Sequence, residues 1–239
     1  MYLDVIELRR FYSTPLGALA ARLIRRRLRL LWPDVSAMSV LGIGYAPPYL
    51  CAFRQQAGRV LAMMPGPQGV VPWPPGGRNL AALVEEVELP LPDAAIDRVI
   101  LVHALENSDQ TPALLRDVWR VMAPGGRLIV VVPNRRSLWA RLERTPFGHG
   151  RPYSVGQLSR LFDQSLFSPV AWSSALFIPP TNQRLILGAF SSLEDWGVRY
   201  WRNFTGVLVV EAEKRIYAGA PPEGRRQLRR APAYPVRSG

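Results

Sequence analysis

The sequence predicts an α/β fold in which helices cover both faces of a mostly parallel sheet. Residues 96–103 and 127–133 are nearly continuous apolar runs rich in β-branched side chains, which is typical of strands buried on both faces. Between them, residues 111–122 repeat apolar side chains at helical spacing. Strand, helix and strand in this order predict a right-handed crossover between parallel strands, the unit of open α/β sheets.

The remaining strands are predicted from shorter apolar runs that lie between turn signals. They span residues 37–43, 59–64, 80–87 (with its loop), 168–177 and 206–213. Thr111 is expected to cap the helix of the crossover, with Pro112 at its first position. Pro124, Gly125 and Gly126 are expected to end that helix and to form the turn into the next strand.

A helix is expected before the first strand, with Thr14 and Pro15 at its start. Its apolar stripe consists of Leu16, Leu19, Ala20, Leu23, Ile24, Leu28 and Leu31. Arginines between positions 22 and 29 cover much of the rest of its surface. This pattern predicts a lid helix that packs on the sheet and turns a basic face to solvent. A membrane-surface helix and a clamp for an anionic substrate stay open as alternatives.

Two helices are expected after residue 133. Residues 137–144 suit a short amphipathic helix, and Ser154 suits the N-cap of the next one. A helical insertion is predicted from Pro179 to about Trp201. The tail from Ala218 onward is rich in Pro, Gly and Arg and is expected to be disordered. The predicted organisation is an N-terminal helical lid (1–34), an α/β domain (35–215) and a basic tail (216–239).

Composition narrows the class of protein. The formal net charge is +12, and nearly all of the positive charge is arginine, with Lys214 the single lysine. A polyanion such as RNA could bind the arginine-rich helix and tail, or the charge could reflect composition alone. The single Cys51 excludes an internal disulfide, and Cys51, His103 and His149 lack the spacing of metal ligands. Because no apolar run is long enough to span a bilayer and no signal-peptide pattern is present, a cytoplasmic protein is predicted.

Three strings carry a family resemblance: LPLPDAAIDRV, VHALEN and LLRDVWRVMAPGGRLIVVVPN, all between residues 89 and 134. They resemble the second half of class I S-adenosylmethionine (SAM) methyltransferases. The resemblance implies a Rossmann-like seven-stranded sheet, mostly parallel, with an antiparallel last strand. It also implies SAM as the cofactor and direct displacement of its methyl group, in which positioning contributes most of the acceleration.

The resemblance also implies cofactor-binding residues, although the first motif departs from the family pattern. VLGIGYAPPYL stands where the family has roughly VLDIGCGTGxL, so Gly42, Gly44, Tyr45 and Ala46 would lie beside the cofactor. A tight turn there lets backbone N–H groups approach the carboxylate end of the cofactor. Met64 takes the place of the acid that usually binds the ribose.

The third and fourth strands supply the other cofactor candidates. Glu85 or Glu86 would accept from the adenine amino group, and Glu106 matches the acid of the family's "LEH" string. His103 ends the fourth strand, at the edge where open α/β sheets bind ligands. His103 is therefore predicted to lie beside the cofactor and to act as general base.

The loop after the fifth strand is the candidate for contact with the methyl acceptor. It contains His149, Arg151 and Tyr153 on a rigid scaffold, and Arg151 could pair with a carboxylate or phosphate. The function predicted from the sequence is SAM-dependent methyl transfer to an unidentified acceptor. The alternative is a catalytically degenerate methyltransferase fold that serves as a binding or assembly module, with RNA as a candidate partner.

Overall fold

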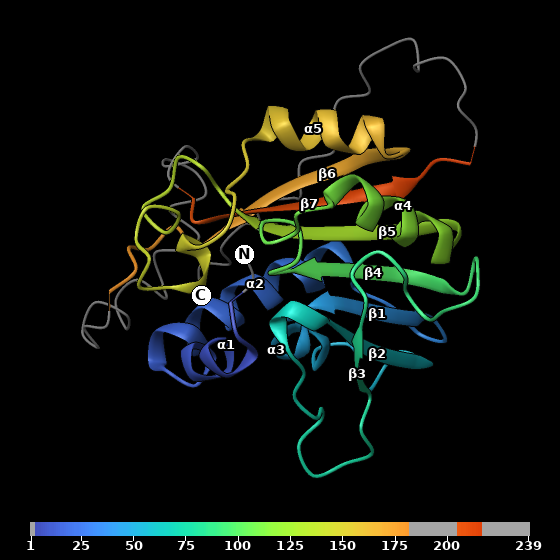
Figure 1. The fold of residues 1–239 in the computed structure, drawn as a ribbon, viewed down its shortest axis with the longest axis horizontal. Coiled ribbons are helices and arrows are strands. Elements are labelled where there is room, and N and C mark those ends of the chain that lie inside the picture. The colour runs from blue at the N-terminus through green and yellow to red at the C-terminus, as the bar shows by residue number, and fades with distance from the viewer. Residues whose placement is uncertain (1–2, 182–204, 217–239) are drawn as a thin grey trace, which may run out of the picture.

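The computed structural model describes residues 3–181 and 205–216. A seven-stranded sheet with the order β3-β2-β1-β4-β5-β7-β6 forms its centre (Figure 1). The strands are β1 (Ser39–Gly44), β2 (Arg59–Pro65), β3 (Ala81–Val84), β4 (Ile96–Val102), β5 (Met122–Pro133), β6 (Phe167–Ala175) and β7 (Val207–Lys214). Strands β1 to β5 are parallel to one another, whereas β7 is antiparallel to both β5 and β6. The predicted Rossmann-like topology is therefore confirmed.

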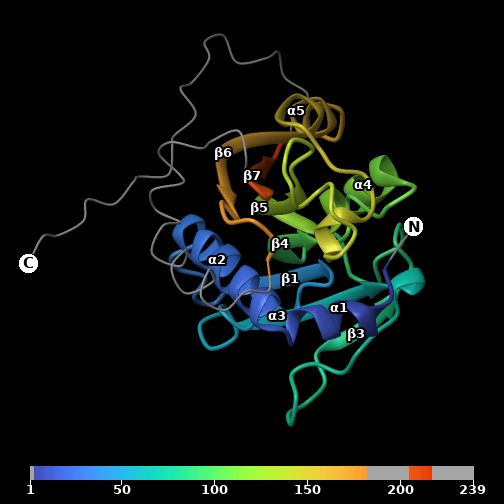
Figure 2. The same ribbon diagram turned by 90° about the vertical axis from the view of Figure 1, so that its left-hand side faces the viewer.

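Helices cover both faces of this sheet. They are α1 (Val5–Tyr12), α2 (Pro15–Leu31), α3 (Pro47–Leu50), α4 (Thr111–Val121) and α5 (Val155–Gln164), with 3₁₀ turns η1 (Gly66–Gln68) and η2 (Pro146–Gly148). Helices α2 and α4 lie on opposite sides of the sheet (Figure 2). The side chain of Thr14 accepts from the N–H of Gly17 and caps α2 as predicted, and the buried residues of α2 join the core on one face.

Helix α1 was not predicted, and it lies at a different place from α2. It precedes α2 and contacts it, and its last residue, Tyr12, contacts Tyr45 after β1 and His103 after β4. A Cβ on Gly17 would overlap the carbonyl of Phe11, so glycine is needed where the two helices turn back on each other. The N-terminal segment thus has two parts, α2 on a sheet face and α1 at the carboxyl edge of the parallel strands.

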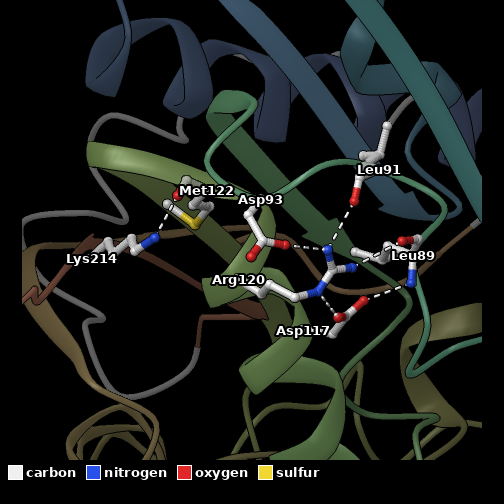
Figure 3. Close-up of polar contacts among 7 residues, drawn as sticks. All are labelled: Leu89, Leu91, Asp93, Asp117, Arg120, Met122 and Lys214. Atoms are coloured by element: carbon white, nitrogen blue, oxygen red, sulfur yellow. Dashed lines mark hydrogen bonds and ion pairs between the residues drawn. The ribbon is translucent and has the colours of Figure 1, made fainter.

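The segment that carries the family strings is held by one arginine of α4. Arg120 donates to the carboxylates of Asp117 (2.6 Å) and Asp93 (2.8 Å). It also donates to the carbonyl oxygens of Leu89 (3.0 Å) and Leu91 (2.8 Å), as Figure 3 shows. Asp117 in turn accepts from the N–H of Leu89 at 2.6 Å. We call these five residues the Arg120 clasp; it fixes the turn before β4 to the helix after it.

Several local predictions are wrong. Thr111 is the first residue of α4 and not its N-cap. Gln110 holds the N-cap position, and its side chain makes no capping hydrogen bond. Residues 124–126 lie within β5, which starts directly after α4, although Gly125 does adopt the positive φ expected of a turn. Residues 137–144 form turns instead of a helix. Side-chain bonds there compete with helix formation: the Ser137 hydroxyl donates to Gly206 O and the Trp139 indole to Ile178 O.

Other predictions are confirmed or lie outside the described residues. Ser154 caps α5 in a capping box with Gln157. Most of the insertion predicted from Pro179 to about Trp201, and the tail from residue 218, fall outside the described ranges. The division at residues 34 and 215 stays a prediction. No helix within the described ranges is both long enough and apolar enough to cross a membrane.

Candidate active site

The loop after β1 is packed tightly on the end of β4. Gly44 has φ +82°, and a Cβ there would overlap the carbonyl oxygen of Val102. The N–H of Tyr45 donates to the same carbonyl at 2.9 Å. This loop therefore turns as the sequence predicts, but one of its amide donors is already used by the protein.

The helix that follows the loop is short and lies directly against β1. A Cβ on Gly42 would overlap the side chains of Ala46 and Leu50, so the glycine at the usual acidic position lets α3 approach the strand. Pro47 and Pro48 begin α3 and have no N–H to offer a ligand. The first loop therefore supplies fewer donors for a carboxylate than the family pattern does.

His103 lies directly after β4 and is fully buried. Its φ of +54° is uncommon for a residue with a side chain and is found mostly where the surrounding structure enforces it. Nδ1 of His103 lies 3.1 Å from Oε1 of Glu106, and Nε2 lies 2.7 Å from the hydroxyl of Tyr12. Both ring nitrogens therefore have partners, the arrangement that orients a general base.

Tyrosines extend this chain of contacts into the protein. The Tyr12 hydroxyl lies 2.6 Å from that of Tyr49, which is fully buried. Burial raises the pKa of Tyr12 well above its ordinary value, and burial likewise raises the pKa of Tyr49. Burial also raises the pKa of Tyr45 to about 12. These phenols stay protonated at neutral pH, so they can donate hydrogen bonds at this edge.

Three side chains at the same edge carry buried polar atoms without a partner among the described residues. They follow β2, β3 and β4 in turn: both amide atoms of Gln68, Oε1 of Glu86 and Oε2 of Glu106. Gln68 and Glu106 are each about 1% exposed. Because leaving a buried polar atom unpaired costs about 1–3 kcal/mol, these atoms point to a polar ligand between the three loops.

The other predicted cofactor residues differ in their surroundings. Met64 is fully buried in the core that α2 covers. Glu85 is exposed and lines a hollow of about 790 Å³ beside the Arg120 clasp, whereas Glu86 is partly buried. The two glutamates that the sequence left as alternatives therefore differ in their exposure to solvent.

The predicted acceptor-side residues are only partly brought together. A cavity of about 600 Å³ lies between α1 and residues 143–149, and its lining includes His149 but neither Arg151 nor Tyr153. The ring of His149 donates to Glu143 O at 2.7 Å. Exposed Arg151 pairs with exposed Asp109, and the Tyr153 hydroxyl donates to Leu105 O at 3.3 Å.

Sequence reasoning missed Tyr12, Tyr49 and Gln68. Tyr12 precedes the first strand, so no strand-end rule points to it. Tyr49 lies near the end of VLGIGYAPPYL, after the positions that the resemblance places beside the cofactor. Gln68 could have been found, since it is the first polar side chain after β2 and a polar group at that strand end suits a ribose.

Comparisons with known proteins agree with this topology. Residues 37–130 match the family model described as "Methyltransferase domain". Two curated relatives are demethylmenaquinone methyltransferases. That of Thermus thermophilus is 29% identical over 179 residues, covering 74% of this chain and 71% of the relative. That of Deinococcus radiodurans is 28% identical over 120 residues, covering 48% and 42%. A SAM-dependent methyltransferase structure from Thermotoga maritima superposes with a TM-score of 0.60 at 16% identity, covering 88% of this chain and 96% of that one.

The sheet order and the matched residues define a class I methyltransferase domain. This chain carries a SAM-dependent methyltransferase domain, and the matches leave the acceptor unidentified. The comparisons thus favour the enzyme over a catalytically degenerate module. Among the described residues, no group of three or more His, Cys, Asp or Glu side chains is arranged to hold a metal ion.

The residues at the edge fit SAM on the side of its hydroxyl and amino groups. Gln68, Glu86 and Glu106 offer unpaired polar atoms from three successive loops, and such groups suit ribose hydroxyls and amino groups. The fit is weaker at the carboxylate end, since Pro47 and Pro48 lack N–H groups.

Proposed function

We propose that the enzyme methylates a small apolar acceptor and that His103 takes the proton which the acceptor loses. The observation that supports this most is the buried His103–Glu106 pair at the carboxyl end of β4. A carboxylate on Nδ1 orients the ring so that Nε2 can accept a proton. Nε2 faces Tyr12, the residue that closes the edge on the side of α1.

SAM, when bound, supplies a methyl group on a positively charged sulfur. Gln68 and Glu86 would hold its nucleoside, and Oε2 of Glu106 would accept from a donor of the cofactor or acceptor. The chain's own contribution is then to orient the two reactants and to exclude water, because His103, Glu106 and the ends of β1 and β4 are all buried.

The acceptor class is inferred from the aromatic lining and from the curated relatives. Phe147 lies 4.9 Å from the His103 ring, and Phe11 lies 6.2 Å from Phe147 between their centroids. Phe11 also lines the cavity between α1 and residues 143–149. Together with the demethylmenaquinone methyltransferases among the relatives, this lining supports an apolar ring compound of the demethylmenaquinone kind as acceptor.

The test is methyl transfer from methyl-labelled SAM to a short-chain demethylmenaquinone, in reduced form, with the full chain and with His103→Gln. The variant is expected to retain binding of S-adenosylhomocysteine by calorimetry and to lose about 10²- to 10⁴-fold in turnover, the usual contribution of a general base. Turnover within threefold of wild type would show that His103 is not the base. No transfer to any apolar ring acceptor would refute the acceptor class.

We also propose a cytoplasmic location and contact with a polyanion. A cytoplasmic location is supported by the need for SAM, which cells make in the cytoplasm, and fractionation of cells that express the tagged chain tests it. Contact of the arginine-rich α2 with RNA or another polyanion is supported by the exposed Arg22, Arg26 and Arg29. A binding constant that does not fall with rising salt would refute it.

A further inference from the structure

Tyr12 reaches the proposed base from outside the matched domain. It is the last residue of α1, yet its hydroxyl lies 2.7 Å from Nε2 of His103, which follows β4. Its ring stacks on that of Tyr45, with centroids 5.5 Å apart and planes 18° apart. One phenol from the N-terminal segment therefore lies in the place that a ligand of His103 would need.

The directions of the hydrogen bonds follow from the burial of Tyr49. Its hydroxyl is fully buried, and the described residues offer its proton no acceptor except Tyr12. Tyr49 must then donate to Tyr12, so Tyr12 donates its own proton to Nε2 of His103. That leaves Nδ1 as the protonated nitrogen, facing the carboxylate of Glu106 at 3.1 Å. A doubly protonated ring would reverse this chain and leave the Tyr49 proton buried and unpaired, which is costly.

Aromatic rings enclose the Tyr12 phenol on several sides. Besides the stacked Tyr45, Phe11 (5.1 Å) and Tyr49 (5.9 Å) meet it edge to face. Such offset and edge contacts select a flat ring over an aliphatic group of equal size. The surroundings of Tyr12 therefore form a slot for one aromatic ring, with a hydrogen-bond acceptor, Nε2 of His103, at its end.

We propose that Tyr12 occupies the place of the methyl acceptor, and that the site takes an aromatic ring whose hydroxyl donates to Nε2 of His103. Acceptor and Tyr12 then exclude each other, and Tyr12 leaves the slot when the acceptor enters. The acceptor would enter from the cavity between α1 and residues 143–149, which is close to the slot because Phe11, the neighbour of Tyr12, lines it. This inference rests on the proposed function in one respect, the role of His103 as base.

The test uses ¹⁵N-histidine NMR of the full chain, which contains only two histidines, so a His149→Gln variant assigns the signals. In Tyr12→Ala, the Nε2 resonance of His103 is expected to move, and added p-cresol is expected to return it towards its wild-type position. Toluene, which has the same ring without the hydroxyl, is expected to leave it unmoved. The affinity for p-cresol should be about tenfold or more higher in Tyr12→Ala than in wild type, since wild type must first displace its own tyrosine.

Ile6→Ala is the matched control, because it truncates an exposed side chain of the same helix while Tyr12 stays on His103; its affinity for p-cresol should equal that of wild type. Equal effects of toluene and p-cresol, or equal affinity of wild type and Tyr12→Ala, would overturn the inference. Should Tyr12→Ala fail to fold by circular dichroism, Tyr12→Phe replaces it: the ring remains, and the Nε2 resonance must still move. An unmoved signal there equally refutes the inference.

The outcomes separate this inference from the proposed function. If p-cresol bonds to His103 but no acceptor is methylated, the slot stands and the proposed function fails. If methyl transfer depends on His103 but no phenol perturbs its signal, the proposed function stands and the slot is wrong.

Discussion

The Arg120 clasp and the carboxyl edge around His103 differ in how far their polar groups have hydrogen-bond partners. In the clasp, Arg120 donates to two carboxylates and two carbonyls, and Asp117 accepts from a backbone N–H as well. At the edge, Gln68, Glu86 and Glu106 carry buried polar atoms without a partner among the described residues. Satisfied groups hold a fold together, whereas unsatisfied ones are kept where a ligand completes them.

The difference shows which part of the molecule the family resemblance identifies. The strings between residues 89 and 134 include the clasp, whose contacts are all internal to the protein. Of the groups proposed to meet a ligand, His103 and Glu106 lie in the VHALEN string. Tyr12 and Gln68 come instead from segments without a motif, namely the end of α1 and the turn after β2. The resemblance thus identifies the scaffold and only part of the proposed chemistry.

The largest expected effect comes from breaking the clasp. Arg120→Ala removes bonds to two acidic side chains and two carbonyls and leaves Asp117, whose side chain is 12% exposed, without its cation. We expect the free energy of unfolding to fall by about 3 kcal/mol, measured by denaturant titration. Asp93→Ala is the matched control: its side chain is 77% exposed, so the loss should stay below about 1 kcal/mol. Equal losses in the two variants would show that the clasp does not hold the turn.

The edge should respond to alkaline pH, because burial raises the pKa of Tyr12 above its ordinary 10.0. The unfolded tyrosine ionises near pH 10 and the folded one does not, so stability is complete below pH 10 and falls as pH rises above it. Tyr12→Phe should therefore lose less stability than wild type between pH 9 and 11. The expected difference is about 1.4 kcal/mol at pH 11, measured from denaturation midpoints. Parallel pH profiles would contradict it.

Replacing an unpaired amide should separate stability from binding. Gln68→Leu removes two buried polar atoms that have no partner among the described residues. We expect the ligand-free protein to gain about 1 kcal/mol of stability, while S-adenosylhomocysteine binds roughly tenfold more weakly by calorimetry. Destabilisation with unchanged affinity would place Gln68 with the clasp, as a structural residue.

The smallest expected effect distinguishes two adjacent glutamates. Glu86→Gln changes a partly buried side chain with an unpaired oxygen, whereas Glu85→Gln changes an exposed one. We expect Glu86→Gln to weaken S-adenosylhomocysteine binding about threefold and Glu85→Gln to leave it unchanged. The reverse order would assign the adenine contact to Glu85.

The sheet could be predicted from the sequence because buried parallel strands have a distinct composition. The strings around β4 and β5 fixed the direction and the order of the crossover, and the antiparallel β7 followed from the resemblance. Helix 137–144 was predicted wrongly because its periodicity is local, while the bonds of Ser137 and Trp139 reach segments far along the chain.

The candidate site could be predicted only where strand ends determine it. His103 and Glu106 were expected at the end of β4, and the structure pairs them. Tyr12 could not be placed, because the path of α1 to that edge depends on the close approach at Gly17 and not on a pattern within α1 itself. A close approach of this kind is visible only in the three-dimensional structure.

The position of Tyr12 has a consequence for how relatives are grouped. The family model matches residues 37–130, and the phenol on His103 comes from residue 12. Two homologues could therefore share every matched position and still differ in which acceptor they take. Transfer of a substrate from one relative to another is safer when the helix ahead of the domain is aligned as well.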